Sequence, residues 1–383
     1  MQWSTSMRAL SLTLLLAAAA AMPAASHAQG VTDKEIIIGQ TAGFTGSLAG
    51  IVAELTQGAK LYLDWINENG GVGGRKITLV SLDDGSVDPK RAGENARQLI
   101  ADKAPLAFFL TRATPLTEAV VAVAKESGVP VIAPSTGAML FHTPVNPLVF
   151  NVRAKYQTEV EQAVEYLNTV GINQIGIIYV NDSFGKDGLE GFNRKMAQLK
   201  LKPAVVVTYE RTNLELVQQA QQIVKANPQA MLLVATGKSA PDVVVRVRKA
   251  GNSTQFIALS NNSAKSFVKD LGPYSRGIMV TQVFPNPAKS SAPIAREMRR
   301  LAQGKKDLVL SHTAMEGYAG AKVLVEGLKR AGKNLTRASL ITALEGIKEF
   351  DLGGVTVTYG PADHTGAEYV ELSIVDAHGE FMQ

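Results

Sequence analysis

The sequence predicts an α/β protein in which two doubly wound, Rossmann-like lobes are joined by a three-segment hinge. Short apolar runs alternate with longer amphipathic stretches, and this alternation favours parallel sheets covered by helices. Apolar, β-branched runs such as residues 36–38 suit strands that are buried on both faces. The alternation restarts after Asn151, so two lobes are the simplest interpretation.

Two sets of alternating elements are expected, one on each side of residue 151. The first has strands at 35–39, 77–82, 106–110 and 129–133, with helices at 52–67, 89–102 and 115–127. The second has strands at 174–180, 204–207, 230–234 and 255–259, with helices at 155–170, 185–199, 213–226 and 239–250.

The last third of the chain breaks this pattern. A strand at 277–283 is followed by Pro285 and Pro287, by helices at 292–301, 311–331 and 336–346, and by strands at 354–359 and 369–376. The helices are expected to pack on lobe one, and the tail is expected to return to lobe two. The predicted boundaries are 29–151 plus 284–350 for lobe one and 152–283 plus 351–383 for lobe two. The chain is therefore expected to cross between the lobes three times, which would form a hinge with a cleft between the lobes.

Residues 1–28 have the layout of a cleavable signal peptide. Arg8 precedes the apolar run 10–21, and Pro23 and a small-residue site ending at Ala28 follow. A membrane anchor is the alternative, but the run is shorter than the roughly 20 apolar residues that a span needs. Export to the periplasm is therefore expected.

The composition excludes several kinds of chemistry. The sequence has no cysteine, which rules out disulfides, thiolate metal sites and cysteine nucleophiles. The net charge of +5 is spread along the chain, whereas nucleic-acid binding calls for a concentrated basic patch.

No catalytic, metal or cofactor motif is present in a convincing context. The glycine cluster 70–74 ends a helix instead of opening one, and the run 237–239 lacks the glycine that a phosphate-binding loop needs five residues earlier. The five histidines are far apart, and there is no Gly-x-Ser-x-Gly elbow. We therefore predict a protein that is not an enzyme and that holds no metal or cofactor.

Several short motifs, taken in order, resemble those of a known family. They are IIIG at 36–39, TG at 45–46, NENGGVGG at 67–74, GVP at 128–130, PSTG at 134–137, NDSFG at 181–185 and EGYAGA at 316–321. In order and spacing they are similar to the type I periplasmic binding proteins of branched-chain amino acid ABC transporters. The resemblance covers essentially all of residues 29–383. It implies two lobes that close on a ligand.

Physical chemistry selects the loops that would hold this ligand. In open α/β sheets, ligands bind beyond the carboxyl ends of the strands, where helix N-termini present donors. In lobe one this rule selects loop 111–114 and loop 134–137, including Thr136. The resemblance implies that Thr114, Ser135 and Gly137 hold the head group of an amino acid. Helix capping is the alternative role for Thr114 and Thr136.

The same rule selects two loops of lobe two. They contribute Asp182, Phe184, Ser260 and Asn261. Phe184 matches a position that is often tyrosine in the family and would cover the ligand, although ordinary packing is the alternative. Three further candidates lie near the cleft: Tyr156 after the first crossing, Phe44 on the first βα loop and Gln282 near the second crossing.

One position departs from the family. Amino-acid-binding members place an acidic residue near the position of Asn261 to pair with the ligand ammonium, and asparagine lacks this charge. Either Asp182 substitutes from the neighbouring loop, or the ligand carries no amine. The ligand class is therefore an amino acid or a related carboxylate or amide.

The predicted function is capture of a small solute by hinge closure and its delivery to an inner-membrane ABC permease, by a protein that is expected to be a monomer. A sensor that reports the ligand to a signalling partner is one alternative. An exported enzyme is another, but the sequence offers no nucleophile–base pair for it.

Overall fold

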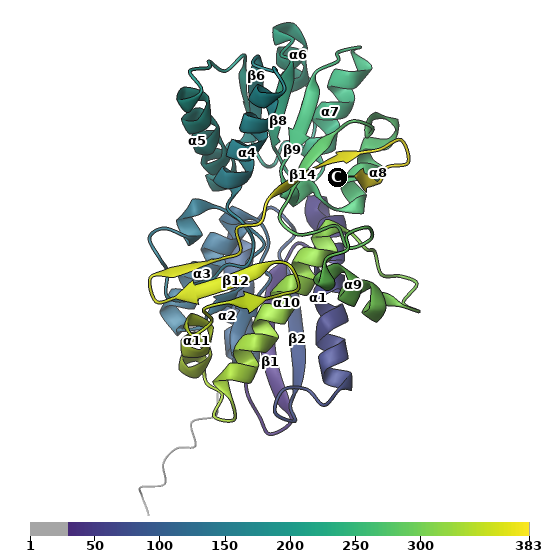
Figure 1. Ribbon diagram of the computed structural model, residues 1–383. Coiled ribbons are helices and arrows are strands. Elements are labelled where there is room, and N and C mark those ends of the chain that lie inside the picture. Colours follow the sequence, from purple (N-terminus) through teal and green to yellow (C-terminus); the bar gives the residue numbers. More distant parts are fainter. Residues whose placement is uncertain (1–29, 383) are drawn as a thin grey trace, which may run out of the picture.

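The computed structural model describes residues 30–382 and shows two lobes, each built around its own sheet (Figure 1). The predicted signal peptide lies outside the described residues. Between residues 30 and 382, no helix combines the length and apolar character needed to cross a membrane.

Lobe one contains a five-stranded parallel sheet in the order β2-β1-β3-β4-β5. Its strands are β1 (Glu35–Ala42), β2 (Lys76–Asp83), β3 (Ala107–Phe109), β4 (Val131–Ile132) and β5 (Val149–Phe150). Its helices are α1 (Ala49–Glu68), α2 (Pro89–Lys103), α3 (Thr114–Ser127) and, from the last third of the chain, α9 (Pro293–Ala302), α10 (His312–Ala331) and α11 (Arg337–Glu345). The parallel register places the carboxyl ends of all five strands at one edge, toward lobe two.

Helices α1 and α10 pack together at glycines. A Cβ on Gly58 would lie 1.8 Å from the carbonyl oxygen of Ala314, and a Cβ on Gly317 would lie 1.9 Å from that of Leu55. Only glycine permits so close an approach of two backbones. This contact holds the last third of the chain against lobe one.

Lobe two contains a seven-stranded sheet in the order β15-β14-β10-β9-β8-β6-β7. Its parallel strands are β6 (Ile175–Val180), β7 (Val206–Tyr209), β8 (Ala230–Val234), β9 (Gln255–Ala258) and β10 (Met279–Gln282). Strand β14 (Glu371–Val375) pairs antiparallel with β10, and β15 (Phe381–Met382) pairs antiparallel with β14. Its helices are α4 (Tyr156–Thr169), α5 (Ser183–Gln198), α6 (Val217–Ala226), α7 (Ser239–Lys249) and α8 (Lys265–Leu271).

The structure differs from the sequence prediction after residue 350. Strands β11 (Phe350–Asp351), β12 (Thr356–Gly360) and β13 (Asp363–Gly366) form a separate antiparallel sheet, seen in yellow beside lobe one in Figure 1. Val357 and Tyr359 are buried in the apolar core of lobe one, and the Tyr359 hydroxyl donates to the Asn151 carbonyl. The boundary predicted at residue 351 is therefore too early for these strands, because their apolar face is buried on lobe one. The third crossing lies between β13 and β14.

Helix α8 is absent from the sequence prediction. It has seven residues, and its N-cap residue, Ala264, offers no side-chain acceptor. The carboxylate of Glu54 on α1 instead accepts hydrogen bonds from the backbone N–H groups of Lys265, at 3.0 Å, and Ser266, at 3.1 Å. A cap supplied across the lobe junction leaves no local sequence signal.

Candidate functional site

A narrow cavity with an empty volume of about 210 Å³ lies at the junction of the two lobes. It is lined from lobe one by Arg112, Ala113 and Thr114, and from lobe two by Tyr156, Phe184, Arg211, Thr236 and Asn261. Most of these residues follow the carboxyl ends of parallel strands, which is where ligands bind in α/β sheets.

The lobe-one wall of this cavity is built from strained backbone. Leu110 and Ala133, which follow β3 and β4, have φ angles of 52° and 51°, and Ala113 has a φ of 68°. Positive φ angles cost a non-glycine residue roughly 1–3 kcal/mol and concentrate at ligand sites. A parallel bridge between Arg112 and Ser135 joins the two loops beyond these turns. The strained backbone thus fixes Arg112 at the cavity.

The guanidinium of Arg112 is buried and is bonded only to neutral acceptors. It donates to Ser135 Oγ at 2.8 Å, to the Ser135 carbonyl at 3.3 Å and, across the junction, to the Asn261 carbonyl at 2.9 Å. The Nε atom of Arg112 has no hydrogen-bond partner. The guanidinium forms no ion pair with a carboxylate of residues 30–382. Burial lowers the pKa of this guanidinium. The site therefore holds a cation that lacks a direct counter-charge.

A second guanidinium, that of Arg211, reaches the cavity from lobe two. Its Nε donates to Asp182 Oδ2 at 2.6 Å. The other oxygen of Asp182 accepts from the backbone N–H groups of Phe184, at 3.0 Å, and Gly185, at 3.2 Å, and so caps α5. Both oxygens of Asp182 are thus engaged, and its carboxylate lies outside the cavity lining.

Aromatic rings form another wall. The rings of Tyr156 and Phe184 meet edge to face with their centroids 4.8 Å apart, and the Arg153 guanidinium lies 4.5 Å from the centroid of the Tyr156 ring. Both rings are buried in the apolar cluster that runs from lobe one into lobe two. This wall suits an apolar group of a ligand.

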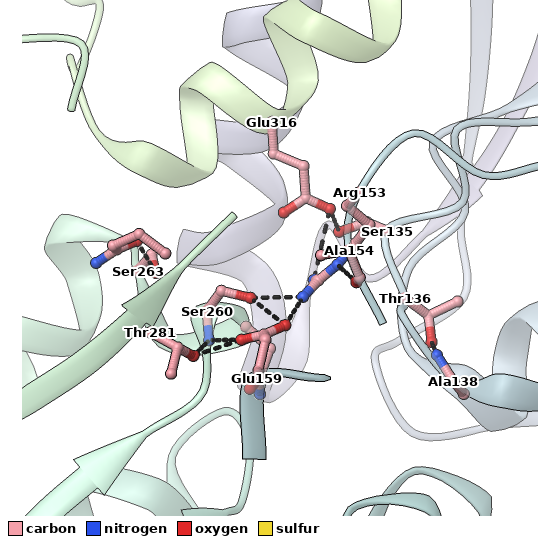
Figure 2. Close-up of polar contacts among 12 residues, drawn as sticks. Ser135, Thr136, Ala138, Arg153, Ala154, Glu159, Ser260, Ser263, Thr281 and Glu316 are labelled. Carbon is pink, nitrogen blue, oxygen red and sulfur yellow. Dashed lines mark hydrogen bonds and ion pairs between the residues drawn. The ribbon is translucent and has the colours of Figure 1, made fainter. Parts of the chain in front are cut away.

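Behind the cavity, a buried polar network joins the lobes at the hinge (Figure 2). Arg153 pairs with Glu159 of lobe two and, at 3.8 Å, with Glu316 of lobe one. Burial alone lowers the pKa of Arg153, but its phenol and carboxylate neighbours raise it further than burial lowers it. Glu159 also accepts from the Ser260 N–H at 2.9 Å and from the Thr281 hydroxyl.

The predicted site residues divide into two groups. Thr114, Tyr156, Phe184 and Asn261 line the cavity. The others lie behind it or away from it: Ser135, Thr136, Gly137, Asp182, Ser260, Gln282 and Phe44.

The second group has identifiable contacts. Ser135 Oγ joins Arg112 to Glu316, to which it donates at 2.7 Å. Thr136 Oγ1 lies 2.8 Å from that of Thr114, whose place as the first residue of α3 leaves Ala113 as the N-cap.

Gly137, Gln282 and Phe44, which also lie outside the cavity lining, have structural contacts. A Cβ on Gly137 would lie 2.4 Å from the Ala154 carbonyl oxygen, so this glycine lets the first crossing pass closely. Gln282 accepts from Ser263 at 2.6 Å inside lobe two, and Phe44 packs against the apolar cluster.

Four lining residues are missing from the predicted set: Arg112, Ala113, Arg211 and Thr236. Arg112 lies within a loop that the prediction selected, but the hydroxyl residues beside it were preferred. Arg211 and Thr236 follow the carboxyl ends of β7 and β8. The strand-end rule, applied to those two strands as well, would have found them.

The lobes contact each other on both sides of the cavity. Glu54 caps α8 across the junction, and Glu118 of α3 accepts a hydrogen bond from Ser183 of α5. The Met139 N–H donates to Asp187 of α5 at 3.1 Å. The structure is therefore the closed arrangement of the two lobes.

Comparison with known proteins identifies this architecture. The family model described as periplasmic binding protein matches residues 35–380. The chain belongs to this family. It is a family of non-enzymatic binding proteins, which confirms the prediction of a binding protein and of the type I periplasmic binding protein fold.

Individual relatives are more distant. The Leu/Ile/Val-binding protein homolog 3 of Brucella melitensis is 23% identical over 351 residues, which cover 85% of this chain and 87% of the relative. A crystal structure of a substrate-binding periplasmic protein from Ralstonia solanacearum matches with 33% identity and a TM-score of 0.85, over 91% of this chain and all of that one. A fatty acid ABC transporter substrate-binding protein from Thermomonospora curvata shares the fold, with 21% identity, a TM-score of 0.82 and 92% coverage of each chain.

Proposed function

We propose that this periplasmic binding protein captures a small carboxylate-bearing solute between its lobes and delivers it to an ABC permease in the inner membrane. The observation that carries the proposal is the cavity at the lobe junction, which is lined from both lobes and presents guanidinium and hydroxyl donors beside aromatic rings. Such donors bind carboxylates with charge-assisted hydrogen bonds. The signal-peptide pattern of residues 1–28 supports a periplasmic location.

Closure of the lobes provides the mechanism. A solute that touches both walls binds the closed form more tightly than the open form, so it shifts the population toward closure. The closed form then presents surfaces of both lobes to the permease. The contacts made by Glu54, Glu118 and Asp187 across the junction support a closed form with its own specific bonds.

The size of the cavity supports a small solute. Its empty volume of about 210 Å³ includes space that is open to solvent, so the enclosed part is smaller still. The names of similar proteins point to Leu/Ile/Val for one relative and to fatty acid for another. These two ligand types share a carboxylate and an apolar body.

A thermal-shift screen tests the proposal. The protein is stripped of bound solute by unfolding and refolding, and is then heated with aliphatic and aromatic amino acids, aliphatic and aromatic acids, amides and urea. A cognate solute raises the melting temperature by mass action. A rise for a carboxylate supports the proposal, whereas no rise for any member of the panel, or a rise for urea alone, contradicts it.

A further inference from the structure

We infer that the solute is an amine-free monocarboxylate whose anionic group lies between Arg112 of lobe one and Arg211 of lobe two. The inference rests on the proposed function and narrows its ligand class. It starts from the charges of the cavity lining, which include two guanidiniums and no carboxylate.

Arg112 provides the first observation. Arg112 is 3% exposed and lines the cavity, and its buried Nε has no hydrogen-bond partner. A buried charge without a partner is unfavourable, and a ligand anion relieves this. The planar fork of a guanidinium also fits the two oxygens of a carboxylate.

Arg211 provides the second observation, from the opposite lobe. Asp182 holds the Arg211 Nε, which orients the guanidinium at the cavity wall. Arg112 and Arg211 carry like charges on lobes that must come together. An anion between them removes this repulsion, so closure is coupled to the arrival of an anion.

The same lining disfavours an ammonium group. Asn261 is neutral, and its side-chain amide donates to the Ala235 carbonyl at 3.0 Å. Asp182 is occupied by two backbone N–H groups and by Arg211. The two carboxylates nearest the hinge, Glu159 and Glu316, are bonded to Arg153 and its neighbours. An α-amino acid would therefore bring its ammonium group next to two cations without an acidic partner.

Matched pairs of ligands test this chemistry by isothermal titration calorimetry. Each pair has one carbon skeleton with and without the α-amino group: 4-methylpentanoate and leucine, 3-phenylpropanoate and phenylalanine. The amide of each acid serves as the uncharged control. The acid of at least one pair is expected to bind tenfold or more tightly than its amino acid and its amide.

Three variants of lobe two assign the effect to Arg211. Arg211→Gln is expected to weaken binding of the acid at least tenfold. Asp182→Asn keeps an oxygen to cap α5 but frees Arg211 from its counter-charge, so it is expected to bind the acid several-fold more tightly. Arg194→Gln, which removes a half-exposed cation on the same helix, is the control and is expected to bind like the wild type.

The outcomes separate this inference from the proposed function. Tight binding of leucine or phenylalanine and weak binding of the matched acid overturns the inference and leaves the proposed function standing. Acid binding that is unchanged in Arg211→Gln overturns the placement between the two arginines. Failure of every carboxylate to bind overturns both.

Discussion

Two groups of buried charge lie side by side at the lobe junction, and they differ in how their charges are matched. At the hinge, Arg153 is paired with a carboxylate from each lobe, and Glu159 accepts further hydrogen bonds. In the cavity, Arg112 has only neutral acceptors and an unpartnered Nε. Both groups are buried to a similar degree. The balanced group has its counter-charges within the protein, although Arg153 Nη1 also lacks a hydrogen-bond partner. The unbalanced group has no carboxylate partner, and in our proposal an anion supplies the missing charge.

The largest effect is expected from breaking the balanced group. Glu159→Gln leaves Arg153 buried without its lobe-two partner, and loss of one partner of a buried pair costs about 3–5 kcal/mol. Chemical denaturation measures the change. Glu161→Gln, two residues along α4 in a half-exposed pair with Arg194, is the control and is expected to cost no more than about 1 kcal/mol. Equal losses for the two variants would contradict the distinction between the groups.

The next largest effect on stability is expected at Asp187, a buried carboxylate whose Oδ2 has no hydrogen-bond partner. Burial raises its pKa to about 6. The folded state therefore binds more protons than the unfolded state between about pH 4 and pH 6, so this group lowers stability as pH rises through that window.

Asp187→Asn is expected to remove this decline. The variant should be more stable than the wild type by about 3 kcal/mol at pH 7, with the difference shrinking toward pH 4. Denaturation curves across this range measure it. A difference that is independent of pH would show that the carboxylate does not titrate in this window.

Removal of the Arg112 guanidinium should reduce the affinity for the ligand more than it reduces the stability of the fold. Arg112→Gln loses three hydrogen bonds but also removes a buried charge, so we expect a loss of stability of no more than about 1.5 kcal/mol. Affinity for the cognate acid is expected to fall roughly 10- to 100-fold, since a hydrogen bond to a charged group contributes about 1.5–3 kcal/mol. A large loss of stability in Arg112→Gln, together with wild-type affinity for the acid, would contradict a binding role for Arg112.

The smallest effect is expected at the edge of the junction. Glu54→Gln weakens the cap on α8, which exists only when the lobes are closed, so affinity should fall about fivefold for a loss of about 1 kcal/mol. Asp64→Asn, an exposed change on the same helix, is the control and should leave affinity unchanged. Equal affinities for wild type and Glu54→Gln would show that this contact does not favour closure.

Much of the fold could be predicted because its signals are local. Apolar runs specify the buried parallel strands, and glycines mark the turns. Helix α8 and the small sheet β11–β13 could not be placed in this way. The cap of α8 comes from Glu54, and the sheet is assigned to lobe one by the burial of Tyr359 there. Such tertiary contacts leave no pattern in the neighbouring sequence.

The site could be predicted to the level of loops but not of side chains. Strand ends locate loop 111–114, yet the sequence does not show that Arg112 lacks a carboxylate partner or that Asp182 is bonded to Arg211. Charge balance depends on which groups from distant segments meet. Since ligand class depends on that balance, it could be argued only from the folded structure.

The most direct test of the central claim is a crystal structure of the wild-type protein with the tightest-binding member of the ligand panel, whatever its chemical class. We predict a ligand carboxylate within hydrogen-bond distance of Arg112 Nε and of the Arg211 guanidinium, with no ammonium group in the cavity. A bound amino acid whose ammonium is paired with a carboxylate of the protein, or a ligand that leaves Arg112 Nε without a partner, would contradict the account.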